Sequence, residues 1–447
     1  MKLAFVNQPI DTILPPYQTS VGACTYGVAC SIADVCEVVV YGAKDSQAGI
    51  EGNVYHRNVK FLFLPSTRSD RLIGKARQIG TRLGWAHSPA STSRWLYPDY
   101  GRQVARELQQ QRCDVIHLQH CSQYVPLIRA LNPNAKIVLH LHAEWFSQNP
   151  VALLEQRLRD VDLVTTVSDY VTAKTRRAFP AIADRCETTY NGIDAKEFSR
   201  ETDYSARKPS RTKCIMYAGA VSPHKGLHVL LDAFKLVVAR YSNVRLEVIG
   251  FQGSYSPDET FDVKDRALLK SLAPFYAKNH LLRLKARLAL AARDAGTYMA
   301  QLKGRLSPDI AQKVTFPGMI PRPDLIDRYY AADVFAFPPI WNEGFGIPPV
   351  EAMAAGTPVV ATRSGAISET VKDRQTGFVV DKNDPQALAN ALLVLLEDDA
   401  LSQAMGRAGR QRALERFTWD RVGQQMYSRY QVLCKGERTL ASPCRGM

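Results

Sequence analysis

One short stretch, residues 342–358, is the most informative part of the chain: Asn342-Glu343-Gly344-Phe345-Gly346-Ile347-Pro348-Pro349-Val350-Glu351-Ala352-Met353-Ala354-Ala355-Gly356-Thr357-Pro358. Two successive prolines fit a helix only in its first turn, and a later glycine suits a helix end. The stretch therefore predicts a glycine loop that runs into a helix of residues 348–355. The free N–H groups of residues 344–347 then gather at the positive end of this helix, a ready site for a diphosphate. Glu343 and Glu351 frame the loop, so their carboxylates can hold opposite ends of one ligand. For either glutamate alone, the alternative is a solvated residue of a capped helix.

The whole stretch resembles the E-x7-E signature of the retaining family-4 glycosyltransferases of the GT-B fold, usually E-G-F-G-x-P-x-x-E-A-M-A-x-G-x-P-V-V. The resemblance implies that Glu343 faces the donor sugar and that Glu351 binds the ribose hydroxyls of a nucleotide. It also implies that sugar and diphosphate oxygens are held by the backbone N–H groups of Gly344, Phe345, Gly346 and Ile347. It implies no cofactor and no metal.

A second stretch, residues 217–226, resembles the family element G-R-L-x-x-x-K-G, in which an arginine and a lysine bind the diphosphate. Lys225 matches the lysine, whereas Ala220 stands where the arginine is expected. One ammonium does not replace a bidentate guanidinium, so either another cation substitutes or the donor is held more weakly. His224 and the basic insert described below are the candidate substitutes. The alternative for Lys225 is an ordinary lysine at the start of a helix.

Further matches are shorter. Gly250 lies in a strand-end turn that resembles the family's G-x-G turn, for which an ordinary turn is the alternative. Met319 follows a segment that resembles the family's segment beside the nucleotide base. Residues 417–420 resemble the start of the family's helix that returns to the N-terminal domain. In the first glycine loop, Gly22 permits close approach of the backbone to a ligand, although Val21 narrows the predicted cleft or shifts the acceptor.

His142 ends the apolar strand of residues 137–141, where the family has a histidine that faces the donor sugar and the acceptor. One alternative is a structural, hydrogen-bonded histidine. Another is a metal cluster with His117, His120 and His140, but the spacing of these residues is not a zinc motif.

Outside these motifs, short apolar runs alternate with helical patterns in both halves of the chain. Runs that are apolar throughout predict parallel strands buried on both faces, and the alternation predicts doubly wound α/β sheets. The expected strands are residues 2–6, 36–42, 59–64, 114–118, 136–141 and 162–167, then 214–218, 244–250, 314–316, 333–338, 358–362 and 377–380. The fold class predicted is α/β of the GT-B type: two Rossmann-like domains facing a cleft, with a basic helical insert in the second.

The expected organisation follows from this alternation. Its segments are an N-terminal acceptor domain of residues 1–195, a polar linker of 196–213, a nucleotide-sugar domain of 214–417 with an insert at about 254–313, and a C-terminal helix and tail of 418–447.

The 447 residues are 46% hydrophobic, and no apolar run approaches the roughly 20 residues that cross a bilayer. The first seven residues contain too short an apolar run for a signal peptide. None of the nine cysteines forms a C-x-x-C pair, which favours reduced thiols. We therefore expect a cytoplasmic protein, soluble or peripheral at the inner face of the membrane.

The net charge of +14 comes from two segments, with +6 in residues 68–112 and +8 in residues 264–313. Such local patches predict an anionic partner, either a membrane surface or an acidic acceptor, and we expect no nucleic acid. In residues 68–85 basic and apolar side chains interleave, a composition typical of a helix at a lipid surface. These side chains are Arg71, Lys75, Arg77, Arg82, Leu72, Ile73, Ile79, Leu83 and Trp85.

The resemblance implies a hexosyltransferase that moves a sugar from a nucleotide-diphosphate donor to a glycan or lipid-linked acceptor with retention of configuration. Two alternatives stay open: another GT-B enzyme, such as a phosphorylase or an epimerase, and a non-catalytic subunit that binds nucleotide sugar. A simple dehydrogenase is disfavoured because no G-x-G-x-x-G follows the first strand.

Overall fold

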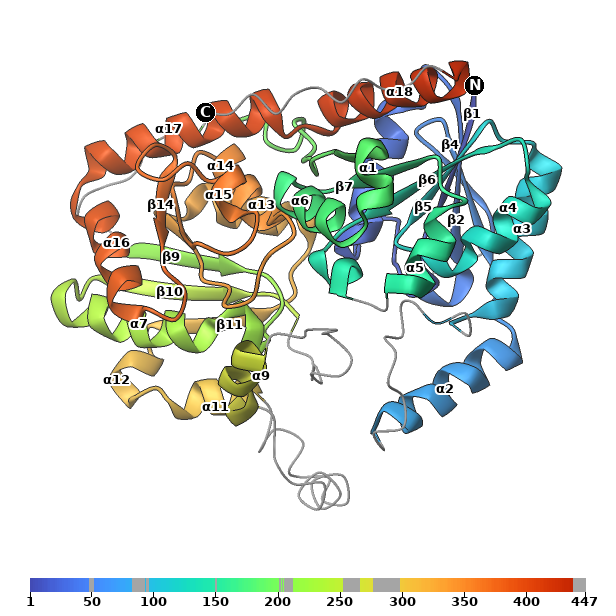
Figure 1. Cartoon of the computed structure of the whole chain (residues 1–447). Coiled ribbons are helices and arrows are strands. Elements are labelled where there is room, and N and C mark those ends of the chain that lie inside the picture. The colour runs from blue at the N-terminus through green and yellow to red at the C-terminus, as the bar shows by residue number, and fades with distance from the viewer. Residues whose placement is uncertain are drawn as a thin grey trace. The chain divides into compact units, whose positions relative to one another are not determined.

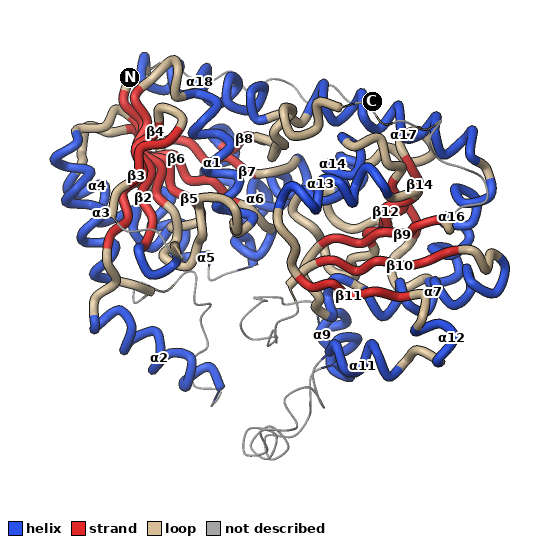
Figure 2. The backbone as a smooth tube through the Cα atoms, turned by 180° about the vertical axis from the view of Figure 1, so that it is seen from behind, coloured by secondary structure: helices blue, strands red, loops and turns tan. Residues whose placement is uncertain are grey.

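The structure of the protein is a computed structural model. It describes residues 1–47, 52–82, 93, 96–148, 151–200, 202, 204, 212–251, 266–275 and 298–436. The chain divides into two compact units, one of Met1–Asp194 with Thr418–Met447 and the other of Ala195–Phe417. Figures 1 and 2 show that each unit is a sheet with helices packed on it, so the predicted pair of Rossmann-like α/β sheets is confirmed.

The first unit is built on a sheet with the order β3-β4-β2-β1-β5-β6-β7-β8. The strands are β1 Lys2–Val6, β2 Glu37–Ala43, β3 Val54–His56, β4 Val59–Leu64, β5 Val115–Gln119, β6 Lys136–Leu141, β7 Leu163–Thr166 and β8 Cys186–Thr188. All neighbours pair in parallel except β3 and β4, which form a hairpin through Arg57 and Asn58, both with positive φ. The order turns back at β1, which pairs with both β2 and β5. Ligands of doubly wound sheets bind at the carboxyl ends of strands beside such a switch point.

The central strands of this sheet, such as β1, β5 and β6, are buried on both faces. Leu3 and Phe5 pack in one apolar cluster with α1 and α18, whereas Ala4 and Val6 pack in another with α3, α4 and α5. Two buried faces explain why these strands are apolar throughout rather than alternating. The helices of the unit are α1 Ser20–Ile32, α2 Arg68–Arg82, α3 Pro98–Gln111, α4 Val125–Leu131, α5 Val151–Leu158, α6 Asp169–Ala178 and α18 Trp419–Lys435.

The second unit has the sheet order β11-β10-β9-β12-β13-β14, with every pair parallel. The strands are β9 Lys213–Ala218, β10 Val244–Ile249, β11 Val314–Gly318, β12 Val334–Phe337, β13 Val359–Thr362 and β14 Gly377–Val380. The helices are α7 Leu227–Arg240, α9 Arg266–Leu272, α11 Tyr298–Gly304, α12 Pro308–Ala311, α13 Arg322–Ala331, α14 Ile347–Ala354, α15 Ile367–Thr370, α16 Pro385–Glu397 and α17 Asp399–Arg416. Helix α7 packs against α16, and α13 packs against α14. The switch point lies between β9 and β12.

Two predicted segments are described only in part. Within the insert the structure describes α9, α11 and α12, while residues 254–265 and 276–297 lie outside the described residues. In the predicted linker, residues 201, 203 and 205–211 also lie outside them. Among the residues that are described, we find no helix with the length and apolar character needed to cross a bilayer.

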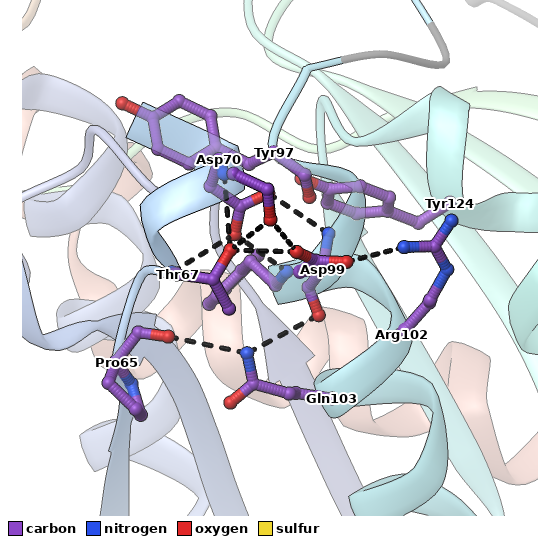
Figure 3. A network of polar contacts seen from close by, with 10 residues as sticks. Pro65, Thr67, Asp70, Tyr97, Asp99, Arg102, Gln103 and Tyr124 are labelled. Atoms are coloured by element: carbon purple, nitrogen blue, oxygen red, sulfur yellow. Dashed lines mark hydrogen bonds and ion pairs between the residues drawn. The ribbon is translucent and has the colours of Figure 1, made fainter. Parts of the chain in front are cut away.

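The first turn of α2 is attached to the start of α3 by a polar network (Figure 3). The N-cap position of α3, Tyr97, has φ 49° and gives no side-chain cap, so Asp70 of α2 supplies one. The buried Asp70 carboxylate accepts hydrogen bonds from the N–H groups of Asp99 at 3.0 Å and Tyr100 at 3.1 Å. Thr67 in turn donates to the Asp99 carboxylate at 2.7 Å. The start of α2 is therefore fixed from inside the first unit.

The C-terminal helix α18 packs against α1 (Figure 1). Its first residue, Trp419, lies against Gly27 and Gly192, where added Cβ atoms would come within 2.4 Å and 2.8 Å of Trp419 atoms. Near its other end, the Tyr430 hydroxyl lies 2.7 Å from Nδ1 of His117 in β5. Glycines at one end and a buried hydrogen bond at the other therefore hold α18 on the sheet.

The variant Tyr430→Phe should lower the free energy of unfolding by about 1–3 kcal/mol, because it leaves a buried ring nitrogen of His117 without its partner. Urea unfolding followed by tryptophan fluorescence measures the change. The control is Tyr427→Phe on the same helix, which removes an exposed hydrogen bond to the Val35 carbonyl. Equal midpoints for both variants would show that the contact between Tyr430 and His117 does not stabilise the unit.

Candidate active site

The loops that follow β9, β10 and β11 meet at one edge of the second sheet. An added Cβ at Gly250 would lie 1.8 Å from the Gly219 carbonyl oxygen, and the Gly250 N–H donates to the Gly318 carbonyl at 2.9 Å. Gly250 also has φ 146°, which favours glycine. The predicted turn at Gly250 therefore lets neighbouring loops contact one another. Met319 follows this edge with a side chain that is 53% exposed.

The glycine loop runs into α14, as expected, and the helix begins at Ile347, one residue before the predicted start. Gly346 occupies the N-cap with φ 87° and provides no side chain, so the N–H of Ile347 has no side-chain cap, while Pro348 and Pro349 carry no N–H. Phe345 packs edge-on against Phe417 at 5.5 Å between ring centroids, so its side chain belongs to the core. Two residues hold the loop in place. The backbone of Gly365 lies directly against that of Glu343, and the Ala366 N–H donates to the Glu343 carbonyl at 3.0 Å. Residues 344–347 can therefore contact a ligand through their backbone.

Glu343 and Lys225, predicted from separate motifs, lie together. The Lys225 Nζ is 2.5 Å from Glu343 Oε1, and the Trp341 indole N–H donates to the same oxygen at 2.6 Å. The ammonium also lies 4.9 Å from the centroid of the Trp341 ring. Both side chains are largely buried, so the ion pair is only weakly screened by solvent. The structure thus brings together one cation and one carboxylate beside the start of α14.

The backbone around Lys225 explains its position. Lys225 ends a short 3-10 helix, Pro223–Lys225, and Gly226 follows with φ 71°. A Cβ at Gly226 would lie 1.9 Å from the Pro338 carbonyl oxygen, so only glycine lets this loop approach the end of β12 so closely. Lys225 is therefore placed beside the switch point between β9 and β12.

Glu351 lies in α14 and has partners that the sequence did not indicate. Arg322, the first residue of α13, forms an ion pair with Glu351 and a second one with Glu197 at 2.7 Å. The Tyr329 hydroxyl donates to Glu351 Oε2 at 2.9 Å. Burial acts to lower the pKa of Arg322, but Glu351 and Glu197 outweigh it and raise that pKa. Arg322 is thus a charged partner of Glu351 that no local motif marked.

Ala220 is half-buried, and its carbonyl accepts a hydrogen bond from the Tyr217 hydroxyl at 2.9 Å. The suggested substitute cation His224 is 3% exposed. Its pKa is far below the usual range because of burial and the nearby Lys225. Without a bound anion the neutral ring of His224 is therefore favoured, and its part as a substitute cation stays a prediction. Most of the insert, the other suggestion, lies outside the described residues.

The variant Ala220→Arg should tighten binding of a nucleoside diphosphate at least about tenfold, because a guanidinium adds charge-assisted hydrogen bonds. The backbone bond from Tyr217 does not depend on the side chain at 220 and is kept. Calorimetric titration measures the affinity, with Ala220→Gln as the uncharged control. If the arginine variant binds no better than the glutamine variant, Ala220 does not occupy the position of the family's arginine.

In the first unit, His142 directly follows β6 and belongs to a row of histidine rings. His140 lies 4.6 Å and His120 5.5 Å from His142 between ring centroids, and His117 lies 5.4 Å from His140. Burial and these neighbouring rings hold the pKa of His142 well below its usual range. Within the described part of the chain, no group of three or more His, Cys, Asp or Glu side chains is arranged to hold a metal ion. The row is therefore a set of uncharged, packed rings.

Gly22 lies in the first turn of α1. Its added Cβ would be 1.9 Å from the Thr12 carbonyl oxygen, and its N–H donates to the Thr19 hydroxyl at 3.1 Å. The close backbone approach predicted for Gly22 is thus a contact with the loop that precedes α1. Its expected part in ligand binding stays a prediction.

Two family models match this chain, and each covers most of one of the two units described above. Residues 199–412 match the family model described as glycosyl transferases group 1, and residues 38–197 match that of glycosyltransferase family 4. A putative glycosyltransferase of Bacillus subtilis, YtcC, is 28% identical over 74% of this chain and 76% of its own length.

Two further comparisons agree. A relative from Mycolicibacterium smegmatis, named a GDP-mannose-dependent alpha-(1-6)-phosphatidylinositol monomannoside mannosyltransferase, is 30% identical over 64% of this chain and 67% of its own length. Among solved structures, Anabaena HepE in complex with UDP and glucose has a TM-score of 0.67 at 19% identity, covering 96% of this chain and 99% of HepE. Together with the two Rossmann-like units, these matches show that the chain is a glycosyltransferase of the group 1 family with the GT-B fold.

Proposed function

We propose that this glycosyltransferase moves a hexose from a nucleotide-diphosphate sugar to an acceptor hydroxyl with retention of configuration, in polysaccharide, glycolipid or related glycoconjugate synthesis. The observation that carries the proposal is the contact of Lys225 with Glu343 at the uncapped start of α14. A cation and free N–H groups suit the diphosphate, and the carboxylate suits sugar hydroxyls. The complex of HepE with UDP and glucose supports a donor of this class.

In the proposed reaction the bond between the anomeric carbon and the diphosphate oxygen breaks, and a bond to the acceptor oxygen forms on the same face of the sugar. Negative charge grows on the leaving diphosphate, where Lys225 and the N–H groups of residues 344–347 stabilise it. Glu343 and His142 orient the sugar. A phosphate oxygen of the donor takes the proton of the acceptor hydroxyl, so no protein base is required.

A thermal-shift screen against UDP, GDP and ADP sugars tests the donor class. A donor at about 100 times its Kd stabilises the folded state by about 2.7 kcal/mol, which raises Tm. We expect one nucleotide to raise Tm both as the sugar conjugate and as the free diphosphate. Absence of a shift with all three nucleotides would contradict the proposal. Binding without release of sugar would favour the alternative of a non-catalytic subunit.

We infer further that the acceptor is lipid-linked or membrane-borne and is reached at an anionic surface. The supporting observation is α2, whose first turn is fixed to α3 (Figure 3) while Leu72 is 66% exposed beside the exposed Arg68 and Arg71. An apolar side chain among cations is what an anionic interface binds. The side chains of Lys75, Arg77, Ile79 and Arg82, and residues Leu83 and Trp85, lie outside the described part of the structure.

Co-sedimentation with anionic vesicles tests this inference. Binding at low salt should fall at roughly 0.5 M salt, where the screening length is only a few ångströms. Leu72→Glu should weaken binding, whereas Tyr55→Glu, at a residue 73% exposed on β3, is the matched control and should not. Binding that is absent at low salt, or equal for both variants, would show that α2 does not contact the membrane.

A further inference from the structure

Gln119 makes a polar contact with His142. Gln119 is the last residue of β5, and β5 pairs with β6 so that Gln119 lies opposite His140. Its side chain is only 2% exposed, and its Oε1 lies 2.7 Å from Nε2 of His142. The contact thus joins the ends of two adjacent parallel strands next to the switch point of the first sheet.

The orientation of the Gln119 amide, with Oε1 toward His142, sets the direction of this hydrogen bond. An amide oxygen accepts and does not donate, so the proton of the bond lies on Nε2 of His142. A neutral imidazole with its proton on Nε2 has a lone pair on Nδ1. Burial and the neighbouring rings of His140, His120 and His117 disfavour an imidazolium at His142 and lower its pKa.

We propose that Gln119 is a positioning residue that holds His142 in its neutral form with the proton on Nε2, so that Nδ1 accepts a hydrogen bond from a sugar hydroxyl. This inference rests on the proposed function. It also restricts what His142 can bind: an uncharged acceptor attracts a hydroxyl or an N–H group and repels a phosphate oxygen. His142 therefore selects for a hydroxyl at the position that it contacts.

The first test is the ring state of His142 in the full-length protein, measured by long-range 15N–1H correlation NMR and assigned with His142→Gln. We expect a protonated Nε2 and an unprotonated Nδ1 throughout the range from about pH 5.5 to 8.5, where an ordinary histidine titrates. A proton on Nδ1, or titration to an imidazolium in this range, would overturn the proposal. This readout needs no substrate, so it is independent of the proposed function.

The second test uses Gln119→Glu, with donor hydrolysis as the activity. The new carboxylate should raise the pKa of His142 and convert Nδ1 from an acceptor to a donor. We expect kcat to fall about 10–100-fold at low pH and to recover as pH rises through that raised pKa, a pH dependence that the wild type lacks. A pH profile equal to that of the wild type would contradict the proposal.

Controls separate this inference from the function on which it rests. Gln123→Leu is the matched control, because Gln123 is a glutamine of similar burial, 7% exposed, in the short 3-10 helix Ser122–Tyr124 after β5. It should leave the pH profile unchanged. In a His142→Gln background, Gln119→Glu should have no further effect on that profile. All these variants should bind the nucleoside diphosphate with the affinity of the wild type. A wild-type protein that does not bind the nucleoside diphosphate would instead contradict the donor proposal.

Discussion

Replacing Glu343 with glutamine should lower turnover of the donor about 10²-fold and leave affinity for the free nucleoside diphosphate almost unchanged. The carboxylate is proposed to orient the sugar, and a small misplacement of reacting groups costs about 10²-fold. The free diphosphate carries no sugar, so it loses no contact with Glu343. Glu343 also holds Lys225 at 2.5 Å, and the amide oxygen of glutamine can still accept a hydrogen bond from this ammonium, so the cation keeps its position.

Steady-state donor hydrolysis and calorimetric titration together measure these two effects. Glu397→Gln is the control, because Glu397 lies at the end of α16 in an ion pair with Arg240, away from the glycine loop. It should change neither quantity. A loss of diphosphate affinity in Glu343→Gln as large as the loss of turnover would contradict the role assigned to Glu343.

Replacing Glu351 with glutamine should have the opposite signature, weaker binding of the nucleoside diphosphate with a smaller effect on turnover at saturating donor. Charge-assisted hydrogen bonds to the ribose contribute about 1.5–3 kcal/mol, or about 10- to 150-fold in affinity. Glutamine keeps the size of the side chain and an oxygen for the Tyr329 hydroxyl, so the helix packing of α14 is preserved.

Titration of this variant with UDP and with GDP measures the loss. The control is Glu197→Gln, which removes the other carboxylate of Arg322 and leaves Glu351 unchanged. If both variants lose affinity equally, the effect comes from Arg322 and not from a contact between Glu351 and the ribose.

Much of the fold could be predicted because strands buried on both faces are apolar without interruption. The bounds of β1, β4, β6 and β14 agree with the predicted ranges. The strands β3 and β8 were missed, because three residues are too few to show any periodicity. The glycine loop and α14 could be predicted because proline and glycine restrict the backbone directly.

The side-chain partners in the site could not be predicted in the same way. Arg322 pairs with a glutamate 29 positions away, and Tyr430 with a histidine 313 positions away. Such contacts depend on which strand ends and helix starts meet in space, and no local pattern records that. Gln119 was overlooked because a glutamine at a strand end has no motif of its own. It became informative only when the paired ends of β5 and β6 placed it beside His142.

The central claim, transfer from a nucleotide-diphosphate sugar with retention, is tested most directly by following donor hydrolysis with 1H NMR at early times. The donor is the one identified by thermal shift, and Lys225→Met is the control that removes the cation proposed to stabilise the leaving diphosphate. We predict slow release of nucleoside diphosphate by the wild type, with free sugar appearing first in the anomeric configuration of the donor, and a much lower rate for Lys225→Met. Sugar appearing first as the opposite anomer, or released equally fast by both proteins, would contradict the account.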